Sequence, residues 1–438
     1  MLERLFHLRE SGTTVRTEIL AGVTTFATLS YIIFVQPAVL STTGMDFGAV
    51  MVATCLAAAL ATLLIGLLAN YPIAAAPAMG HNFFFAYTVV AGMGVPWAVA
   101  LGADFLAGAV FIGLAAFRFR EAVMDAVPES LKAAIPAGIG LLIAFVGLQM
   151  AGIVVPSAGA FAKLGRLTAP PTLLAIAGFL AIALLQLRRV RGAILIGILG
   201  TTVVGAVLGL LPFRGIVAAP PSLAPTFLRL DLAGALKPGL LDVVLIFLFL
   251  AVFDTVGTLI GVSTQAGLLR DGKLPRAGRA LLADAIGTTA GTALGTSTVT
   301  AYVESAAGTA AGGRTGLANV VTAALLVLAI FFHPLAQLMG GSVRSGDLQL
   351  SPVTAAALMT IGYLMVGNAA RVRWDDLSDA VPAFLTLVVM PLSLSIADGL
   401  AFGFISCALL KLLAGRGREL RPLTYVLAAL FVVRFAVM

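Results

Sequence analysis

The segment LAVFDTVGTLIG, residues 250–261, lies within an apolar run that covers residues 238–262. A run of about 20 apolar residues is long enough to cross a lipid bilayer as a helix. A carboxyl group inside such a helix is costly and is usually kept for function, so Asp254 marks a candidate site. Neither Lys nor Arg lies within two helical turns of it, and removal from water favours its protonated form. The alternative is that Asp254 caps a neighbouring broken helix.

Similar apolar runs fill the rest of the 438-residue chain, which is 60% hydrophobic and 11% charged, with a mean hydropathy of +1.07. A soluble protein carries about 25% charged residues, so this composition excludes an ordinary soluble domain. It predicts an all-α polytopic membrane protein with fourteen transmembrane spans. We expect these spans near residues 17–38, 48–69, 73–90, 95–117, 131–153, 170–187, 191–212, 238–262, 278–295, 297–312, 316–338, 351–368, 380–396 and 397–413.

The basic residues indicate the orientation of these spans. Most of the 27 Lys and Arg residues fall between alternate pairs of spans, on the side that also holds the N-terminus. Because such residues favour the cytoplasmic side, we expect a multi-pass protein of the cell (inner) membrane with a cytoplasmic N-terminus. Residues 421–437 are apolar but short and contain Arg434. They are either a fifteenth span or a helix on the cytoplasmic face, and we prefer the second interpretation.

The chain also contains two pairs of similar segments, each pair separated by seven spans. Residues 140–152 resemble residues 356–368, and Pro- or Gly-rich breaks occur near 72–85 and 291–305. An odd number of spans between two copies inverts the second copy, so this spacing predicts a 7+7 inverted repeat. We expect short extended segments followed by half-helices in the broken third and tenth spans, with helix N-termini directed at a central site. The alternative is ordinary kinks and close packing of small residues.

Three further acidic residues stand out within the predicted spans. Glu304 follows the tenth-span break, and its carboxylate can accept two parallel hydrogen bonds from adjacent N–H groups, such as those of a purine. Its alternative role is to stabilise the start of the half-helix. Asp284 lies near the start of the ninth span, where a structural role and a proton-coupling role are equally expected. Asp104 in the fourth span either pairs with His81 or caps a neighbouring segment.

Neutral residues after the third-span break add to the candidate site. The amide of Asn82 carries both donors and acceptors and can read the edge of a base. Phe84, among neighbouring aromatic residues, offers a ring on which a flat heterocycle can stack, although most membrane aromatics contact lipid or core. His81 is a candidate for proton coupling, and a packed neutral histidine is equally expected. Cysteine and histidine spacing predicts neither a metal site nor a disulfide, and we expect no cofactor.

Several segments resemble the nucleobase–ascorbate transporter superfamily, and within it the AzgA-like guanine, hypoxanthine and adenine permeases. The resemblance runs nearly end to end. It is carried by Thr17-Glu18 with Tyr31-Ile-Ile-Phe-Val-Gln-Pro37, Ala76-Pro77-Ala-Met-Gly80 with Asn82, Phe253-Asp254-Thr255-Val-Gly257-Thr258, Gly295-Thr-Ser-Thr298, Tyr302-Val-Glu304-Ser, and Gly312-Gly-Arg314. The segment Gly80-His81-Asn82-Phe83 departs from the family's usual Gly-Leu-Asn-Ala.

The resemblance implies secondary active uptake of a purine nucleobase coupled to a cation, H⁺ by expectation, through movement of a core domain against a gate domain. The expected core comprises residues 1–125 and 231–340, the gate 126–230 and 341–415, and residues 416–438 a cytoplasmic or interfacial tail. A homodimer through the gate is implied as well. The residues expected to bind substrate are Asn82, Phe84, Asp254, Thr298 and Glu304, and those expected to couple protons are Asp254, Glu304, Asp284 and His81.

Other functions remain open at this point. A transporter of the same fold could carry uracil, xanthine or another small solute, although Glu304 argues against an inorganic anion, for which a basic residue is expected. A channel would conduct without saturation. A membrane-embedded enzyme needs a catalytic constellation, and the sequence has no GxSxG motif, no metal-binding His cluster and no nucleotide-binding loop. We therefore expect a transporter and not an enzyme.

Overall fold

The structure is a computed structural model that describes residues 2–116, 127–157, 160–190, 192–213, 215–268, 274–346 and 348–437. Its helices are α1 (Leu2–Phe6), α2 (Val15–Leu29), α3 (Ile32–Leu40), α4 (Phe47–Leu64), α5 (Met79–Phe83), α6 (Trp97–Ala116), α8 (Glu129–Met150), α9 (Pro170–Leu187), α10 (Ala193–Val207), α11 (Leu232–Ala235), α12 (Leu241–Gln265), α13 (Ala277–Leu294), α14 (Ser305–Ala310), α15 (Gly316–Ala329), α16 (His333–Gly340), α17 (Pro352–Val366), α18 (Leu377–Ser393), α19 (Ile396–Leu413) and α20 (Pro422–Val437). The strands are β1 (Ala75–Pro77), β2 (Val154–Ser157), β3 (Ala160–Leu164), β4 (Val299–Ala301), β5 (Val343–Ser345) and β6 (Leu348–Leu350).

Within the described residues, 9 helices are long and apolar enough to cross a membrane. Three shorter apolar helices, α10, α18 and α20, accompany them. This confirms a mostly helical, multi-pass membrane protein. Each predicted span coincides with a helix, or with the strand and half-helix expected at a break, whereas the number of segments that cross the bilayer remains a prediction.

Local signals in the sequence explain where several helices begin and end. The side chain of Thr14 accepts a hydrogen bond from the backbone N–H of Thr17 and caps α2, and Asp46 caps α4 through the N–H of Ala49. Such oxygens satisfy donors that a helix leaves free at its first turn. Helix α13 ends at Gly295, whose φ of 104° lies in the left-handed region that a glycine adopts without strain.

The two predicted breaks contain the short strands that the sequence suggested. In the third predicted span, β1 leads into α5 and then into a π-helical stretch, Phe84–Gly92. In the tenth, β4 leads into α14. The two strands pair antiparallel, with Ala75 opposite Ala301 and Pro77 opposite Val299. Segments more than 200 residues apart therefore meet in the interior.

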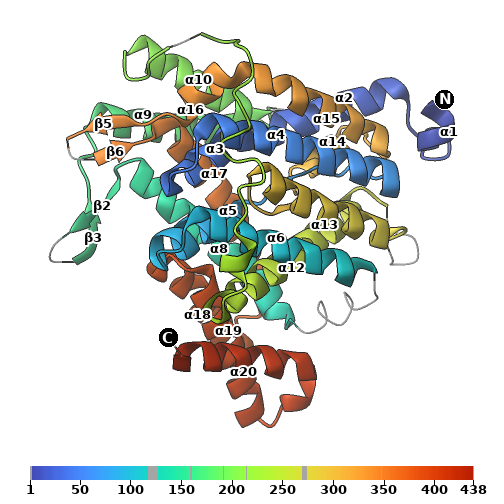
Figure 1. Cartoon of the computed structure of the whole chain (residues 1–438), viewed down its shortest axis with the longest axis vertical. Helices are drawn as coiled ribbons and strands as arrows, with labels where there is room; N and C mark the ends of the chain where they lie inside the picture. The colour runs from blue at the N-terminus through green and yellow to red at the C-terminus, as the bar shows by residue number, and fades with distance from the viewer. Residues whose placement is uncertain are drawn as a thin grey trace.

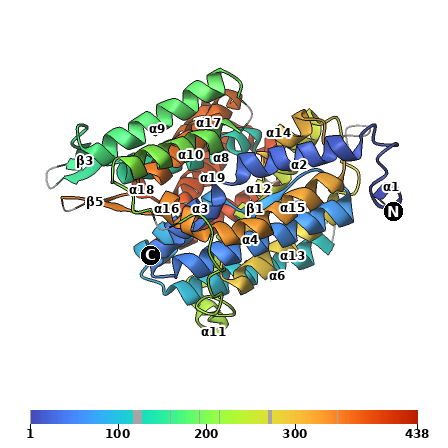
Figure 2. The ribbon, with the colours of Figure 1, turned by 90° about the horizontal axis from the view of Figure 1, so that it is seen from above.

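The long helices pack as two groups. Helices α2, α4, α6, α12, α13, α14 and α15 pack mainly on one another and enclose the β1–β4 pair; we call them the first bundle. Helices α8, α9, α10, α17, α18 and α19 pack mainly on one another and form the second bundle. Figure 2 shows α9, α10 and α17 of the second bundle apart from α4, α6, α13 and α15 of the first. Of the candidate site residues, Asp254 and Asp284 lie on helices of the first bundle, Thr298 and Glu304 flank strand β4, and His81, Asn82 and Phe84 follow strand β1 on α5 and the π-helical stretch.

The similar segments at 140–152 and 356–368 meet in the second bundle. They lie on α8 and α17, which cross closely at two glycines. A Cβ added to Gly140 would lie 2.7 Å from the carbonyl oxygen of Gly362, and one added to Gly362 would lie 2.7 Å from the carbonyl oxygen of Gly140. A reciprocal contact of this kind is typical of two copies related by a two-fold axis.

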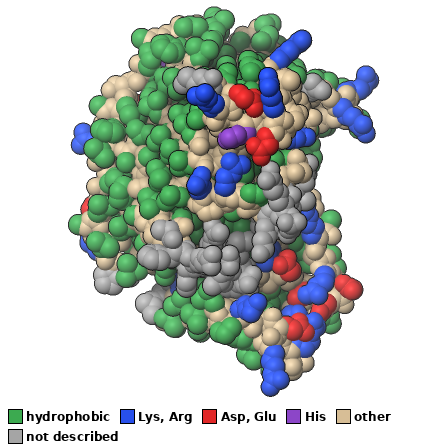
Figure 3. All heavy atoms as spheres, turned by 90° about the vertical axis from the view of Figure 1, so that its right-hand side faces the viewer, with side chains coloured by type: hydrophobic (Ala, Val, Ile, Leu, Met, Phe, Trp, Pro, Cys, Tyr) green, Lys and Arg blue, Asp and Glu red, His purple; other side chains and the backbone are tan. Residues whose placement is uncertain are grey.

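The two ends of the helices differ in character. The hairpins β2–β3 and β5–β6 lie at the left of Figure 1, and the N-terminal helix α1 lies at the right. We call these the hairpin side and the N-terminal side. Figure 3 faces the N-terminal side and shows Lys and Arg side chains gathered on it, beside a hydrophobic flank. The cytoplasmic location of this side remains a prediction from the same basic residues.

Candidate functional site

The β1–β4 pair is the centre of the candidate site. Two strands of three residues leave backbone groups without a ladder partner, and buried groups of this kind need hydrogen bonds. Threonine side chains from the surrounding helices supply them. The hydroxyl of Thr62 on α4 bonds both the N–H and the C=O of Ala75, at 2.9 Å each, and Thr288 on α13 donates to the C=O of Val299 at 2.6 Å.

Asp104 has a structural role at this centre. Its Oδ2 accepts the backbone N–H of Thr298 at 2.7 Å, and its Oδ1 accepts the hydroxyl of the same residue. Both side chains are fully buried. Of the two roles predicted for Asp104, the structure therefore supports capping of a neighbouring segment, while His81 is not its hydrogen-bond partner.

Asp254 lies on α12 beside strand β4. Its Oδ2 accepts a hydrogen bond from the Thr300 hydroxyl at 3.0 Å, so it does not cap a helix through this contact. Its side chain is exposed, and Gly257 and Gly261 lie on the same face of α12, where no atom of the described residues comes within 4 Å of an added Cβ. A carboxyl group would be costly against lipid, so we expect this face to contact water.

Glu304 directly follows the strand that holds Thr300. It occupies the N-cap position of α14, yet its side chain makes no capping bond. Instead its Oε1 accepts the hydroxyl of Tyr31 at 2.6 Å, and the carboxyl group is partly exposed. The neighbouring Val303 is 61% exposed. Glu304 thus lies on a partly exposed segment four residues after Thr300, and its carboxyl group bonds Tyr31 and not the first turn of α14.

Asp284 is buried on α13. Its Oδ2 accepts the hydroxyl of Thr255, the residue next to Asp254, at 2.6 Å. The four candidate acids therefore form two classes: the side chains of Asp104 and Asp284 are buried, whereas that of Asp254 is exposed and that of Glu304 is partly exposed. Each accepts a hydroxyl hydrogen bond, and within the described ranges none is paired with Lys or Arg.

Asn82 on α5 belongs to a buried polar chain. Its Nδ2 donates to Oε1 of Gln36 at 2.7 Å, and Nε2 of Gln36 donates to the hydroxyls of Thr296 and Ser297 at 3.0 and 2.8 Å. The Oδ1 of Asn82 is left without a hydrogen-bond partner among the residues that the structure describes. A buried acceptor of this kind costs free energy unless a ligand or water satisfies it.

The remaining candidates are buried away from the open face. Phe84 packs edge-on against Phe247 with ring centroids 4.9 Å apart. Thr298 uses its hydroxyl and its N–H on Asp104. His81 is buried, and neither of its ring nitrogens has a hydrogen-bond partner in the described part of the chain. For these three residues, a direct role in transport stays a prediction.

Tyr31, Gln36 and Thr300 were not assigned a role from the sequence, although each bonds a candidate residue. Gln36 carried a usable signal, because an uncharged polar side chain inside the apolar stretch Ile32–Leu40 needs a partner there. Tyr31 lies at the join between α2 and α3. Its partner is 273 positions away in the sequence, so no local pattern predicts the contact.

Comparison with known proteins shows the family to which this chain belongs. A family model described as "Permease family" matches residues 16–402. The adenine permease AdeP of Escherichia coli is 46% identical over 435 residues, covering 99% of this chain and 96% of that protein. The guanine/hypoxanthine permease PbuG of Bacillus subtilis is 44% identical over 446 residues, covering 99% of both.

A solved structure supports the fold. The transmembrane domain of the cyanobacterial bicarbonate transporter BicA has a TM-score of 0.65, covering 89% of this chain and 97% of that one at 16% identity. At this identity the likeness concerns the fold alone. The resemblance noted in the sequence is confirmed by the relatives, and the chain belongs to the permease family, as a multi-pass membrane transporter and not an enzyme.

Proposed function

We propose that this protein takes up purine nucleobases together with protons. Relatives named as adenine and as guanine/hypoxanthine permeases, similar over nearly their whole length, support a purine as the substrate. The relatives do not distinguish adenine from guanine and hypoxanthine, because permeases of both kinds are about equally similar to this chain. Uracil or xanthine on the same fold is the competing proposal.

The observation that carries the proposal is the pair of accessible membrane carboxyl groups, Asp254 and Glu304, on either side of Thr300. Glu304 is proposed to accept adjacent N–H groups of the base, because a carboxylate has two acceptor oxygens in one plane. Asn82 offers its free Oδ1 as a further acceptor. Phe84 and Thr298 are proposed to pack behind the residues that contact the purine.

Proton coupling is proposed from the same residues. A carboxylate in the membrane that lacks a cationic partner is costly, and binding a proton removes its charge. Asp254 carries the coupling proton in this proposal. Asp284 is linked to the residue beside Asp254 through the Thr255 hydroxyl, and His81 is the remaining candidate.

We assign the two bundles to a moving core and a gate. The core is residues 1–125 and 231–340, and the gate is residues 126–230 and 341–415. The proposal also includes fourteen spans in a 7+7 inverted repeat. The protein lies in the inner membrane, and its N-terminus lies in the cytoplasm. The reciprocal α8–α17 contact supports the repeat. Exposed apolar side chains on α9, among them Leu180 and Leu187, offer a surface for a homodimer through the gate.

The proposal is tested by uptake of labelled adenine, guanine, hypoxanthine, xanthine and uracil into proteoliposomes. We expect saturable uptake of a purine that unlabelled purines inhibit. Asp254→Asn and Glu304→Gln should each lower uptake by at least about 100-fold, as expected for loss of a charged hydrogen-bond partner worth about 3 kcal/mol, while both variants elute as folded protein. Uptake that survives both changes contradicts the proposed site, and preference for uracil or xanthine contradicts the proposed substrate.

A further inference from the structure

The C-terminal helix α20 lies antiparallel along α19 for most of its length (Figure 1). Near its start, the hydroxyl of Tyr425 donates to the C=O of Gly417, just beyond the end of α19. Further along, the Phe431 ring lies 5.9 Å from that of Phe404. Near its end, Phe435 lies 5.7 Å from Phe402. Sixteen residues of helix extend about 24 Å, about 6 Å less than the hydrocarbon layer of a typical bilayer.

Helix α20 lacks the charged face that a helix lying in the membrane interface presents to water. Arg434 is its single charged residue, and that side chain is 9% exposed. Large apolar side chains, including Val426, Leu430 and Val433, are exposed instead. A helix in the membrane interface needs a charged face toward water, and α20 directs its apolar residues outward and its charge inward. This favours the fifteenth span over the cytoplasmic helix that we preferred from the sequence.

Arg434 connects the two bundles. Its Nη1 lies 2.9 Å from Oδ1 of Asp398, in the first turn of α19, and its Nε lies 3.3 Å from Oδ2 of Asp242, in the first turn of α12. Helix α12 belongs to the first bundle and α19 to the second. A guanidinium group has several donors in a fixed plane and can therefore hold two carboxylates at once.

This contact lies at the opposite end of α12 from the open face. Asp242 begins the helix, whereas Gly257 and Gly261 follow Asp254 toward its other end. The two bundles are therefore joined by Arg434 at one end of α12, and toward the other end no described residue packs against Gly257 or Gly261. Movement of one bundle against the other has to break or stretch at least one of the two ion pairs.

We propose that α20 crosses the membrane and that Arg434 is a latch, which closes the transporter on the hairpin side by binding Asp242 of the first bundle and Asp398 of the second. The latch rests on the proposed movement of the two bundles, but it needs neither a purine substrate nor proton coupling. Loss of the latch should favour the conformation that opens toward the hairpin side.

Chemical labelling of single cysteines tests whether α20 crosses the membrane. In a variant with Cys55 and Cys407 replaced by Ala, one cysteine is placed at Ala436, Arg418 or Arg344, all of which are exposed. A membrane-impermeant maleimide should reach Ala436→Cys from the same side as Arg344→Cys in hairpin β5–β6, and Arg418→Cys from the other side. Labelling of Ala436→Cys from the side of Arg418→Cys overturns the crossing.

The latch itself is tested by labelling Gly257→Cys from each side, in right-side-out and inside-out vesicles. Arg434→Ala, Asp242→Asn and Asp398→Asn should each raise the labelling rate from the hairpin side by roughly five-fold or more, the lower end of coupling between linked sites. Labelling from the N-terminal side should fall. Lys132→Gln, which breaks a 2.6 Å ion pair inside α8 alone, is the matched control and should leave both rates unchanged.

A folding defect is separated from loss of the latch by two comparisons. Each variant must keep the elution profile of the unmodified protein, and Arg434→Lys, which keeps the charge, should restore labelling partly toward the unmodified rates. Rates that stay within two-fold of the unmodified protein in folded Arg434→Ala, or that change equally in Lys132→Gln, overturn the latch. Because labelling needs no substrate, failure of purine uptake leaves this result interpretable.

Discussion

At the scale of single residues, Tyr31 holds the carboxyl group on which the proposed purine site depends. Its hydroxyl donates to Glu304 over 2.6 Å from the join between α2 and α3. A hydrogen bond to a charged group contributes about 1.5–3 kcal/mol. Tyr31→Phe should therefore raise the KM for the purine by roughly ten-fold or more, with a smaller change in maximal rate. Tyr363→Phe, which loses a hydrogen bond to Gln186 in the second bundle, is the control. Equal KM values in the two variants would contradict this role.

Asp104 makes a different prediction, because its role is structural. Asp104→Ala removes both acceptors of Thr298 and leaves a buried N–H and a hydroxyl unsatisfied. Each buried unsatisfied group costs about 1–3 kcal/mol. We expect a lower midpoint of thermal unfolding in detergent, with Asp104→Asn less affected because it retains one acceptor oxygen. An unchanged midpoint in Asp104→Ala would show that the strand does not depend on this contact.

At the scale of elements, close helix contacts depend on glycine. A Cβ on Gly316, at the start of α15, would lie 1.9 Å from the carbonyl oxygen of Gly66. Gly316→Ala should destabilise the protein by about 1–3 kcal/mol or more, since a backbone atom cannot move aside as a side chain can. Gly200→Ala on α10 has open space around it and should stay within about 1 kcal/mol of the unmodified protein. Unfolding in detergent compares the two variants, and equal losses of stability would contradict the packing argument.

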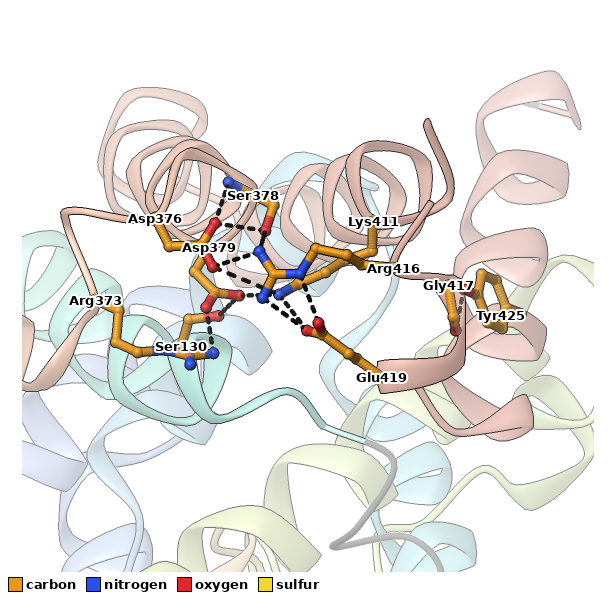
Figure 4. A network of polar contacts seen from close by, with 10 residues as sticks. All are labelled: Ser130, Arg373, Asp376, Ser378, Asp379, Lys411, Arg416, Gly417, Glu419 and Tyr425. Atoms are coloured by element: carbon orange, nitrogen blue, oxygen red, sulfur yellow. Dashed lines mark hydrogen bonds and ion pairs between the residues drawn. The ribbon is translucent and has the colours of Figure 1, made fainter. Parts of the chain in front are cut away.

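A network of charges joins three elements of the second bundle at their ends (Figure 4). Lys411 at the end of α19 lies 3.1 Å from Asp379 of α18, and Ser130 of α8 donates to the same carboxylate at 3.2 Å. Arg416 donates to Asp376 and to Glu419 at 2.7 and 2.5 Å. The network ties the helix ends together where the chain leaves α19 and turns into α20.

The network predicts a loss of stability in acid. Hydrogen bonds from Ser378 and Arg416 lower the pKa of Asp376, and those from Arg416 and Lys411 lower the pKa of Glu419 to about 2. The unfolded chain binds protons at a higher pH than the folded one, so the stabilisation is complete above the ordinary carboxyl pKa of about 4. It is lost as the pH falls from about 4 to about 2. Arg416→Gln should start from a lower unfolding midpoint and lose less over this range, and parallel curves for the two proteins would contradict the assignment.

At the scale of the whole molecule, the proposed cycle couples the purine to a proton. Asp254 and Glu304 lack Lys or Arg partners within the described residues, so a bound proton lowers the cost of moving them through the membrane. We expect purine accumulation in proteoliposomes to require an inward proton gradient and to stop with a protonophore. Exchange of internal for external purine should continue under the same conditions. Accumulation restored by a sodium gradient would contradict proton coupling.

The membrane segments were largely predictable from the sequence, because the preference of a residue for lipid is local and adds along a helix. The breaks near Pro77 and Gly295 were predictable for the same reason, since proline and glycine interrupt a helix at the position where they occur. For α20, apolar character alone did not separate a span from a surface helix. The burial of Arg434 against the protein favours a span. This burial depends on Asp242 and Asp398, which are far from Arg434 in the sequence.

The sequence by itself determined that the chain is a polytopic membrane protein, where its spans are interrupted, and which acids lie inside them. The tertiary structure decided which of those acids are accessible. Asp104 and Asp254 look alike in the sequence, as acids surrounded by apolar residues, yet the Asp104 side chain is buried against Thr298 and that of Asp254 is exposed. The physical reason is that the cost of a membrane carboxyl group is set by its own segment, whereas its exposure and its partners depend on strands and helices up to 273 positions away.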